Sequence, residues 1–159
     1  MKKSVKKVTP RKATSWDETF MRMAHVISGR SKDPSTQVGS VIVDQNNIVV
    51  GLGYNGFPRG IKNTDLPWGK EGSLEDTKYA YICHAEENAI YNANNSTKNC
   101  KLYSTLFPCN ECAKTIIQNG IKEVIYEDNK YANTPSDKAS VRMFKLAKVN
   151  LRKYKSNMK

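Results

Sequence analysis

The sequence predicts an α/β fold in which a sheet has helices packed against both of its faces. Three observations support this prediction. Apolar side chains recur at helical spacing over residues 16–27, two β-rich runs separated by a polar turn follow, and helix and strand patterns then alternate to residue 154. Such alternation favours a layered structure. A chain of 159 residues is expected to form one domain with its own hydrophobic core.

The first helix is expected over residues 16–29. Ser15 and Glu18 have the spacing of a capping box, in which the side chain of each residue accepts a hydrogen bond from the backbone N–H of the other. Pro34 opposes any continuation of the helix. The apolar side chains Trp16, Phe20, Met23, Ala24 and Ile27 recur at helical spacing.

A β-hairpin is predicted next. Residues 38–43 are rich in Val and Ile, residues 44–47 form a polar turn, and residues 48–54 form the returning strand. Residues 55–80 are rich in Gly, Pro, Asn and charged side chains, so we expect a long loop. Loops of this length in compact domains are usually functional.

The second half of the chain alternates helices and strands. Pro108 suits the opening of a helix, and Gly120 suits its end. Pro135 is placed in a loop. The expected elements are helix 84–94, strand 101–106, helix 108–120, strand 121–126, loop 128–136, helix 137–147 and strand 149–154.

The formal net charge of +11 is concentrated at the two ends. Residues 1–14 hold six basic side chains and residues 142–159 hold seven, without one acidic residue, whereas residues 15–141 hold 13 basic and 15 acidic side chains. We therefore interpret 1–14 and 156–159 as tails and 15–155 as a single domain. Solvated ends explain the charge better than a specific nucleic-acid surface, although a weak, salt-sensitive attraction to polyanions is expected.

The sequence favours a cytoplasmic protein that does not enter a membrane. No apolar run approaches the roughly 18 residues that a membrane helix needs, and the basic N-terminal segment is not followed by the apolar region of a signal peptide. The four cysteines are therefore expected to be thiols. Cys109 and Cys112 form a CxxC pair, which indicates either a metal site or a redox pair.

Two short segments at predicted helix starts carry the chemistry. They are His84-Ala85-Glu86 and Pro108-Cys109-Asn110-Glu111-Cys112. His84, Cys109 and Cys112 match a catalytic zinc site, which uses three nitrogen or sulfur ligands and leaves a fourth position open for water. Cysteines three residues apart face the same side of a first helical turn, where the helix dipole favours thiolates.

Glu86 is the predicted catalytic residue. Zinc activates water toward attack on C4 of a cytosine ring, and Glu86 would take a proton from that water and pass it to N3 and to the leaving amine. The H-x-E and P-C-x-x-C pair is the signature of zinc nucleobase deaminases. A structural zinc or a buried thiol pair without metal are the alternatives. A structural site needs a fourth ligand, and the remaining His and Cys residues are His25, Cys83 and Cys100.

From residue 15 to about 154, the chain resembles the deoxycytidylate (dCMP) deaminase family within the cytidine deaminase superfamily. The matching segments are SWDETFMRMA, RSKDPSTQVGSVIVD, GYNGFPRG, HAEENAI, LYSTLFPCNECAK and IKEVIYEDNKY. The resemblance implies a three-layer α/β/α fold with a mixed five-stranded sheet, and one catalytic Zn²⁺ per subunit. It also implies a homo-oligomer, often a hexamer, which deaminates dCMP to dUMP for thymidylate synthesis. Activation by dCTP and inhibition by dTTP, with Mg²⁺, complete the implied properties.

The resemblance also suggests binding residues. The substrate set is Asn55, Ala85, Arg59, Lys130 and Tyr131, and the effector set is Arg30, Ser31, Lys32, Asp33, Asn55 and Gly56. Asn55 and Gly56 alternatively form a simple turn. The charges after the first helix alternatively complement its dipole. Arg59, Lys130 and Tyr131, proposed for the substrate phosphate and a lid, are alternatively surface residues.

Two other functions remain open. The first is deamination of another cytosine nucleotide or of tRNA adenosine, because the same zinc chemistry attacks C6 of adenine. The near-neutral middle of the chain and the RSKDP and GYNGFPRG segments weigh against the tRNA substrate. The second is a binding module without enzymatic activity, in which zinc only stabilises the fold. Glu86 weighs against it, because a structural metal needs no carboxylate at that position.

Overall fold

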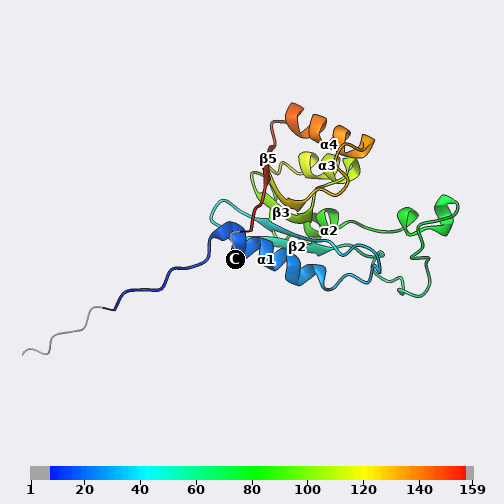
Figure 1. Ribbon diagram of the computed structural model, residues 1–159, viewed down its shortest axis with the longest axis horizontal. Coiled ribbons are helices and arrows are strands. Elements are labelled where there is room, and N and C mark those ends of the chain that lie inside the picture. The colour runs from blue at the N-terminus through cyan, green and yellow to red at the C-terminus, as the bar shows by residue number, and fades with distance from the viewer. Residues whose placement is uncertain (1–7, 157–159) are drawn as a thin grey trace, which may run out of the picture.

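The computed structural model describes residues 8–156, which contain four α-helices and one five-stranded sheet (Figure 1). The helices are α1 (Trp16–Ser28), α2 (Ala85–Tyr91), α3 (Asn110–Gln118) and α4 (Pro135–Leu146). The strands are β1 (Gly39–Val43), β2 (Val49–Tyr54), β3 (Lys101–Leu106), β4 (Glu123–Asp128) and β5 (Asn150–Lys153). None of the helices within residues 8–156 combines the length and the apolar character that a membrane-spanning helix requires.

The sheet is mixed, with the strand order β2-β1-β3-β4-β5. β1 pairs antiparallel with both β2 and β3, so the hairpin forms one edge of the sheet. β3, β4 and β5 run parallel to one another, because each is joined to the next by a helix. Ser40 in β1 lies directly opposite Ser104 in β3. This arrangement confirms the predicted mixed five-stranded sheet.

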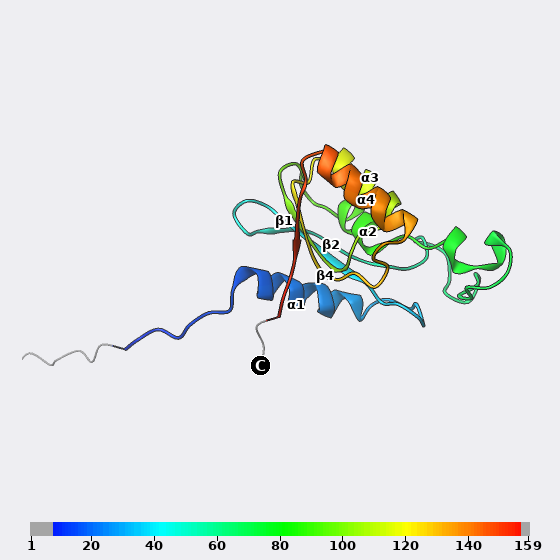
Figure 2. The ribbon, with the colours of Figure 1, turned by 45° about the horizontal axis from the view of Figure 1, so that its top comes forward.

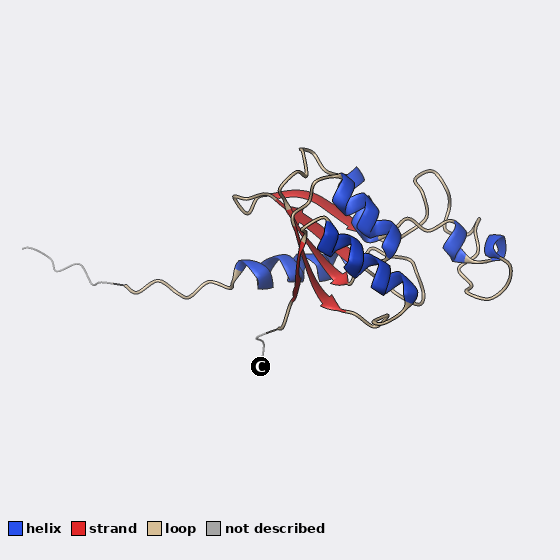
Figure 3. Ribbon diagram, turned by 90° about the horizontal axis from the view of Figure 1, so that it is seen from above, coloured by secondary structure: helices blue, strands red, loops and turns tan. Residues whose placement is uncertain are grey.

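Helices cover both faces of the sheet, which confirms the predicted three-layer architecture (Figures 2 and 3). On one face, α1 packs Phe20, Met21 and Ala24 against the sheet. On the other face, α2, α3 and α4 share a larger core with the strands. The alternation of side chains along β1 separates the two cores: Val41 faces α1, whereas Ile42 faces the three-helix layer.

α2 lies unusually close to β2, and two glycines make this contact possible. A Cβ atom at Gly53 would lie 2.2 Å from the backbone oxygen of Ala85, and one at Gly51 would lie 2.3 Å from that of Ala89. A side chain at either glycine would push α2 away from the sheet. The two glycines therefore fix the distance between the sheet and the helix that begins beside His84.

Several element boundaries differ from the sequence prediction by one to three residues, and the differences at α2, at α4 and within residues 55–80 are the most informative. α2 ends at Tyr91 with Asn92 as its C-cap, not at Asn94. Pro135 is not in a loop but is the first residue of α4, where Thr134 caps the helix by accepting a hydrogen bond from the backbone N–H of Asp137. Proline suits this position because its missing N–H is not needed there. The long segment 55–80, predicted as loop, contains two short 3₁₀ helices, Leu74–Asp76 and Lys78–Ala80.

The folded part of the chain does not end where the basic C-terminal stretch begins. Residues 8–15 have no regular secondary structure and are exposed, whereas the predicted tail residues 1–7 and 157–159 lie outside the described residues. The basic C-terminal stretch is partly internal, because Arg152 in β5 forms ion pairs with Asp17 in α1 and Glu123 in β4. This arginine ties the first helix to the last strand.

Candidate active site

A pocket opens where the starts of α2 and α3 meet the end of β2. It is lined by His84 and Glu86 from the start of α2, by Cys109 from the start of α3, and by Asn55 from the end of β2. These residues are far apart in the chain, and the sheet brings their segments together. The pocket is therefore lined by three of the four residues that the sequence predicts for the chemistry, His84, Glu86 and Cys109.

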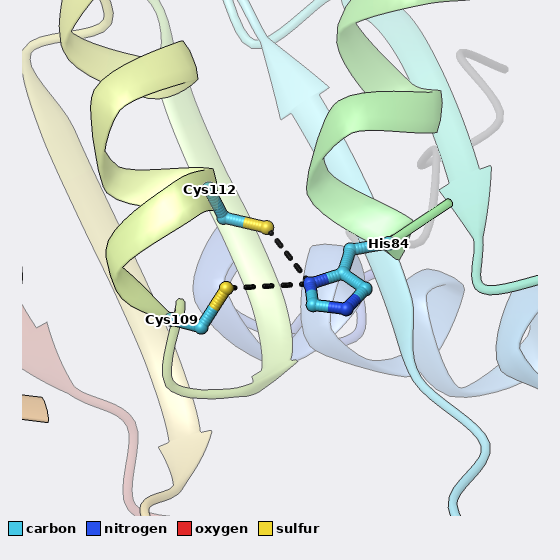
Figure 4. Close-up of side chains that lie close together, drawn as sticks. All are labelled: His84, Cys109 and Cys112. Atoms are coloured by element: carbon cyan, nitrogen blue, oxygen red, sulfur yellow. Dashed lines mark hydrogen bonds between the residues drawn. The ribbon is translucent and has the colours of Figure 1, made fainter. Parts of the chain in front are cut away.

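His84, Cys109 and Cys112 converge at one side of this pocket (Figure 4). The Nδ1 atom of His84 lies 3.3 Å from the Sγ atoms of both cysteines, and all three atoms lie within 4.8 Å of one another. Zinc bonds of about 2.0 Å to nitrogen and 2.3 Å to sulfur, at a tetrahedral angle, separate these atoms by roughly 3.6 Å. The three side chains fit a tetrahedral zinc site.

The backbone at the starts of α2 and α3 directs the side chains of His84, Cys109 and Cys112 toward one point. His84 is the N-cap of α2, and its backbone N–H donates to Oε2 of Glu87 at 3.4 Å. Cys109 is the N-cap of α3, and Cys112 lies in the first turn of the same helix. Cysteines three residues apart project from one side of that turn.

The pKa shifts of the His84, Cys109 and Cys112 side chains also favour a bound cation. A hydrogen bond from Cys112 lowers the pKa of Cys109 to about 4, whereas the same contact and burial raise the pKa of Cys112 well above its ordinary value. The hydrogen bond with Cys109 raises the pKa of His84 to about 9. The two thiols cannot easily both be anions without a positive charge between them, and a divalent cation supplies that charge.

Glu86 lies beside the three side chains and is only 4% exposed. Its Oε2 atom accepts a hydrogen bond from Cys112 Sγ at 3.6 Å, and its Oε1 atom accepts one from Ser104 Oγ at 3.5 Å. Burial raises the pKa of the Glu86 carboxyl, and the nearby His84 acts in the opposite direction. A carboxyl group with a raised pKa is suited to both accepting and donating protons near neutral pH.

The model of the cytidine and deoxycytidylate deaminase zinc-binding region matches residues 14–128. The chain belongs to the cytidine and deoxycytidylate deaminase family. As a member of this deaminase family, it is a hydrolase that acts on carbon–nitrogen bonds.

Individual relatives agree with this assignment. The deoxycytidylate deaminase of Mus musculus is 52% identical over 141 residues, which cover 87% of this chain and 79% of the relative. The probable deoxycytidylate deaminase of Drosophila melanogaster is 48% identical over 146 residues, which cover 87% of this chain and 72% of the relative. The crystal structure of the dCMP deaminase from the cyanophage S-TIM5, in complex with dCMP and dUMP, has a TM-score of 0.69 and 25% identity, and the match covers 86% of this chain and 95% of that chain.

Two buried hydroxyl groups support Glu86 in this deaminase. Ser40 and Ser104 are both 0% exposed, and Ser40 Oγ donates to Ser104 Oγ at 3.1 Å, which in turn donates to Glu86. Both serines point toward the three-helix layer, because they alternate with residues that face α1. The sequence did not indicate either residue. Their only signal was the position of each serine within a predicted strand, 38–43 or 101–106.

Asp33, which the resemblance assigned to an effector site, and Asn55, which it assigned to both the substrate and the effector set, line the same pocket as His84 and Glu86. Both are buried, at 2% and 5% exposure. The Asn55 side chain accepts a hydrogen bond from the backbone N–H of Val38 at 2.8 Å and donates to the backbone oxygen of Thr36 at 2.9 Å. The amide of Asn55 therefore fixes the loop that precedes β1 to the end of β2.

Lys78 is a pocket residue that the sequence did not reveal. It is 4% exposed and forms an ion pair with Asp33, which is 45 residues away in the chain. Burial alone raises the pKa of the Asp33 carboxyl, but the hydrogen bonds from Lys78 and two backbone N–H groups outweigh it and hold that pKa below its ordinary value. Nothing in a single lysine within a polar loop predicts such a partner.

The other residues suggested for substrate binding do not all line the pocket. Ala85 and Tyr131 line the pocket, and Lys130 Nζ donates to Oγ1 of Thr36, another pocket residue, at 2.9 Å. Lys130 also lies 5.0 Å from the centre of the Tyr131 ring. Arg59 is not among the residues that line this pocket. It bonds Asn92 at the end of α2 and lines a separate surface hollow with Cys83.

The other suggested effector residues lie around the segment that follows α1. Arg30 and Lys32 are both exposed. Ser31 Oγ donates to the backbone oxygen of Asn55 at 2.8 Å, and Gly56 forms an isolated bridge with Cys83. The structure thus connects this segment to the catalytic pocket through Asn55, but it does not gather all six residues into one cavity.

Proposed function

We propose that this chain catalyses the zinc-dependent hydrolytic deamination of dCMP to dUMP, with release of ammonia. The observation that carries the proposal is the convergence of His84 Nδ1 with the two Sγ atoms of Cys109 and Cys112, with the Glu86 carboxyl beside them. The names of the mouse and fly relatives and the dCMP and dUMP bound to the cyanophage enzyme support the choice of substrate.

The residues that would hold the metal are His84, Cys109 and Cys112. Zinc at this position supplies an activated water and a positive charge beside the reacting carbon. The reaction adds water at C4 of the cytosine ring and breaks the bond between C4 and the exocyclic nitrogen, so that ammonia leaves and a uracil ring remains.

Glu86 moves the protons in this scheme. Its carboxylate accepts a proton from the attacking water, donates it to ring N3, and assists protonation of the leaving amine. Its position supports this role, because Ser104 Oγ donates to Oε1 of Glu86 and orients the carboxyl beside the three side chains that would hold the metal. The burial of Glu86 keeps bulk water from competing for these protons.

The pocket supports a small nucleotide as the substrate. Its volume of about 270 Å³ is close to the lower end of the roughly 300–1,000 Å³ that small-molecule pockets occupy. Within it, we assign Asn55, Ala85 and Tyr131 to the base and sugar. Tyr131 is 50% exposed, so its ring is accessible to cover a bound nucleotide.

We also propose that dCTP activates and dTTP inhibits the enzyme, with Mg²⁺ bound to the triphosphate and with the chain assembled as a homo-oligomer such as a hexamer. Arg30 and Lys32 are the cations assigned to the triphosphate. The bond between Ser31 and the backbone of Asn55 offers a physical connection from that segment to the catalytic pocket. Titration of dCTP and dTTP into the dCMP assay tests this regulation, and unchanged rates with both would exclude it.

A cytoplasmic location completes the proposal, because dUMP formed there supplies thymidylate synthesis. The four cysteines, all within the described part of the chain, are free thiols, which is typical of a reducing compartment.

An ultraviolet assay of the purified protein tests the proposed reaction. Cytidine, deoxycytidine, dCMP and dCTP are compared as substrates, with a tRNA substrate in a parallel assay of adenosine deamination. We expect dCMP to be deaminated with the highest kcat/KM. Activity on the tRNA alone, or on none of these compounds in protein that contains zinc, would exclude the proposal.

A further inference from the structure

Two lysines of the segment 55–80 face the catalytic pocket. Lys70 and Lys78 both line the pocket that contains His84 and Glu86, although this segment projects beyond the end of the sheet (Figure 1). Lys78 is 4% exposed, whereas Lys70 is exposed. A buried lysine in a substrate pocket requires an explanation, because burial of an ammonium group is costly unless it is paired.

Asp33 pairs with Lys78, and its carboxylate has no capacity left for a ligand. Its Oδ1 atom accepts the backbone N–H groups of Ser35 and Thr36 at 2.9 and 3.2 Å. Its Oδ2 atom accepts Lys78 Nζ and, at 3.3 Å, Asn55 Nδ2. A carboxylate has about four acceptor positions, and all of them are used. Asp33 therefore holds Lys78 in place and does not itself bind a nucleotide.

Lys78 keeps donors that the protein does not use. An ammonium group has three N–H donors, and the carboxylate of Asp33 is its one hydrogen-bond acceptor in the part of the chain that the structure describes. The ring of Tyr79 lies 5.8 Å from Nζ and offers no acceptor atom in hydrogen-bond reach. Two N–H groups of a fixed lysine thus remain available in a pocket for a small nucleotide.

Lys70 is the second available cation. Within residues 8–156 it has neither a hydrogen-bond nor an ion-pair partner. The other cations suggested for the substrate are not among the residues that line this pocket: Lys130 bonds Thr36, and Arg59 bonds Asn92. Lys70 and Lys78 are therefore the lysines that line the pocket and still have free donors.

We propose that Lys78 and Lys70 form the subsite for the 5′-phosphate of the substrate, and that Asp33 is the residue that positions Lys78. This inference rests on the proposed dCMP deamination. A phosphate monoester carries a charge of about −1.5 to −2 at pH 7, and two ammonium groups balance it. The subsite distinguishes a nucleotide from a nucleoside, so its loss should affect dCMP and spare deoxycytidine, which has the same base and sugar.

The test measures kcat/KM for dCMP and for deoxycytidine in matched variants. Lys70→Met removes the exposed cation. Asp33→Asn/Lys78→Met removes the buried pair together, so that no unpaired charge remains in the interior. Lys62→Met is the control, because Lys62 is an exposed lysine of the same segment that does not line the pocket. Melting temperature and zinc content are measured for each protein, so that loss of folding is recognised.

We expect the preference for dCMP over deoxycytidine to fall by roughly tenfold or more in the double variant. It should fall by about threefold in Lys70→Met, since an exposed cation contributes less, and stay unchanged in Lys62→Met. An unchanged preference in both test variants would overturn the inference, as would equal losses on the two substrates. A selective loss of dCMP activity in Arg59→Met would also overturn it, because it would assign the phosphate to Arg59.

Product binding separates failure of this inference from failure of the proposed function. Calorimetry compares dUMP with deoxyuridine on the wild-type chain and on the same variants, and it requires no turnover. Weaker binding of dUMP alone in the lysine variants supports the phosphate subsite even if the wild-type chain does not deaminate dCMP. Deamination of dCMP with dUMP binding that is unaffected by both test variants would retain the proposed function and reject the subsite.

Discussion

At the scale of single residues, the site depends on partners that come from distant segments. Glu86 accepts a hydrogen bond from Ser104, and Asp33 accepts one from Lys78. The sequence could reveal His84, Glu86, Cys109 and Cys112, because their spacing follows from local helix geometry and metal chemistry. It could not reveal Lys78 or Ser104, because a contact that forms only through tertiary folding produces no pattern in the sequence around either residue.

Glu86→Gln is expected to retain zinc and to lose deamination. The amide has a similar size to the carboxylate but cannot accept and return a proton, and loss of a general acid–base group costs roughly 10²- to 10⁴-fold in rate. Zinc content by elemental analysis and the rate of dCMP loss by ultraviolet absorbance are measured on the same sample. A wild-type rate in this variant would show that Glu86 does not carry the protons.

Ser104→Ala is expected to lower kcat by roughly threefold and to leave KM for dCMP unchanged. The alanine removes the hydroxyl that bonds Oε1 of Glu86, so the carboxyl is less well positioned, whereas the substrate contacts stay intact. Ser40→Ala serves as the comparison, because Ser40 reaches Glu86 only through Ser104 and should have a smaller effect. An unchanged kcat in Ser104→Ala, with unchanged zinc content, would exclude the positioning role.

At the scale of secondary-structure elements, the distance between β2 and α2 decides where His84 and Glu86 lie. The sequence predicted the hairpin and the helix, but a glycine in a β-rich run does not by itself indicate which helix lies against it. Element ends were predicted less well for a similar reason. Thr134-Pro135 was interpreted as loop because proline breaks helices, although the same residues form a favourable helix start.

Gly53→Ala is expected to destabilise the protein by more than the roughly 1–3 kcal/mol typical of overpacked cores, because the new Cβ would meet backbone atoms of α2 at 2.2 Å. Movement of α2 would also displace His84, so zinc retention should fall. Gly69→Ala is the control, since its nearest neighbouring atom would lie 4.0 Å away. Thermal unfolding and zinc content are measured for both, and equal values for the two variants would contradict the account of this contact.

At the scale of the whole molecule, ion pairs connect the first helix of the domain to its last strand. Arg152 in β5 forms ion pairs with Asp17 in α1 and Glu123 in β4, and Asp17 also accepts a hydrogen bond from Tyr103 at 2.8 Å. The net charge of the terminal segments was predictable from composition. The internal role of Arg152 was not, because its partner Asp17 is 135 residues away.

This arrangement predicts a dependence of stability on acid pH. The hydrogen bond from Arg152 lowers the pKa of Asp17, and the partners of Asp33 hold its pKa low as well. A carboxyl whose pKa is lower in the folded state stabilises the fold above its unfolded pKa of about 3.9, and this contribution is lost as pH falls through the folded value. We therefore expect the melting temperature to decline most steeply below about pH 4.

Asp17→Asn separates this effect from the acid release of zinc, which is common to both proteins. The variant should melt at a lower temperature near pH 7, and the difference from the wild-type chain should shrink as pH falls toward 3. Thermal unfolding at matched pH values provides the measurement. A difference that stays constant over this range would show that the Asp17 charge does not contribute.

The most direct test of the central claim is the ultraviolet assay of dCMP deamination on one protein sample before zinc removal, after it, and after zinc is restored. We expect conversion of dCMP to dUMP to stop when zinc is removed and to return when about one equivalent of zinc per chain is added. Full activity in protein shown to be free of zinc, or no conversion of dCMP by protein that contains one zinc per chain, would contradict the account.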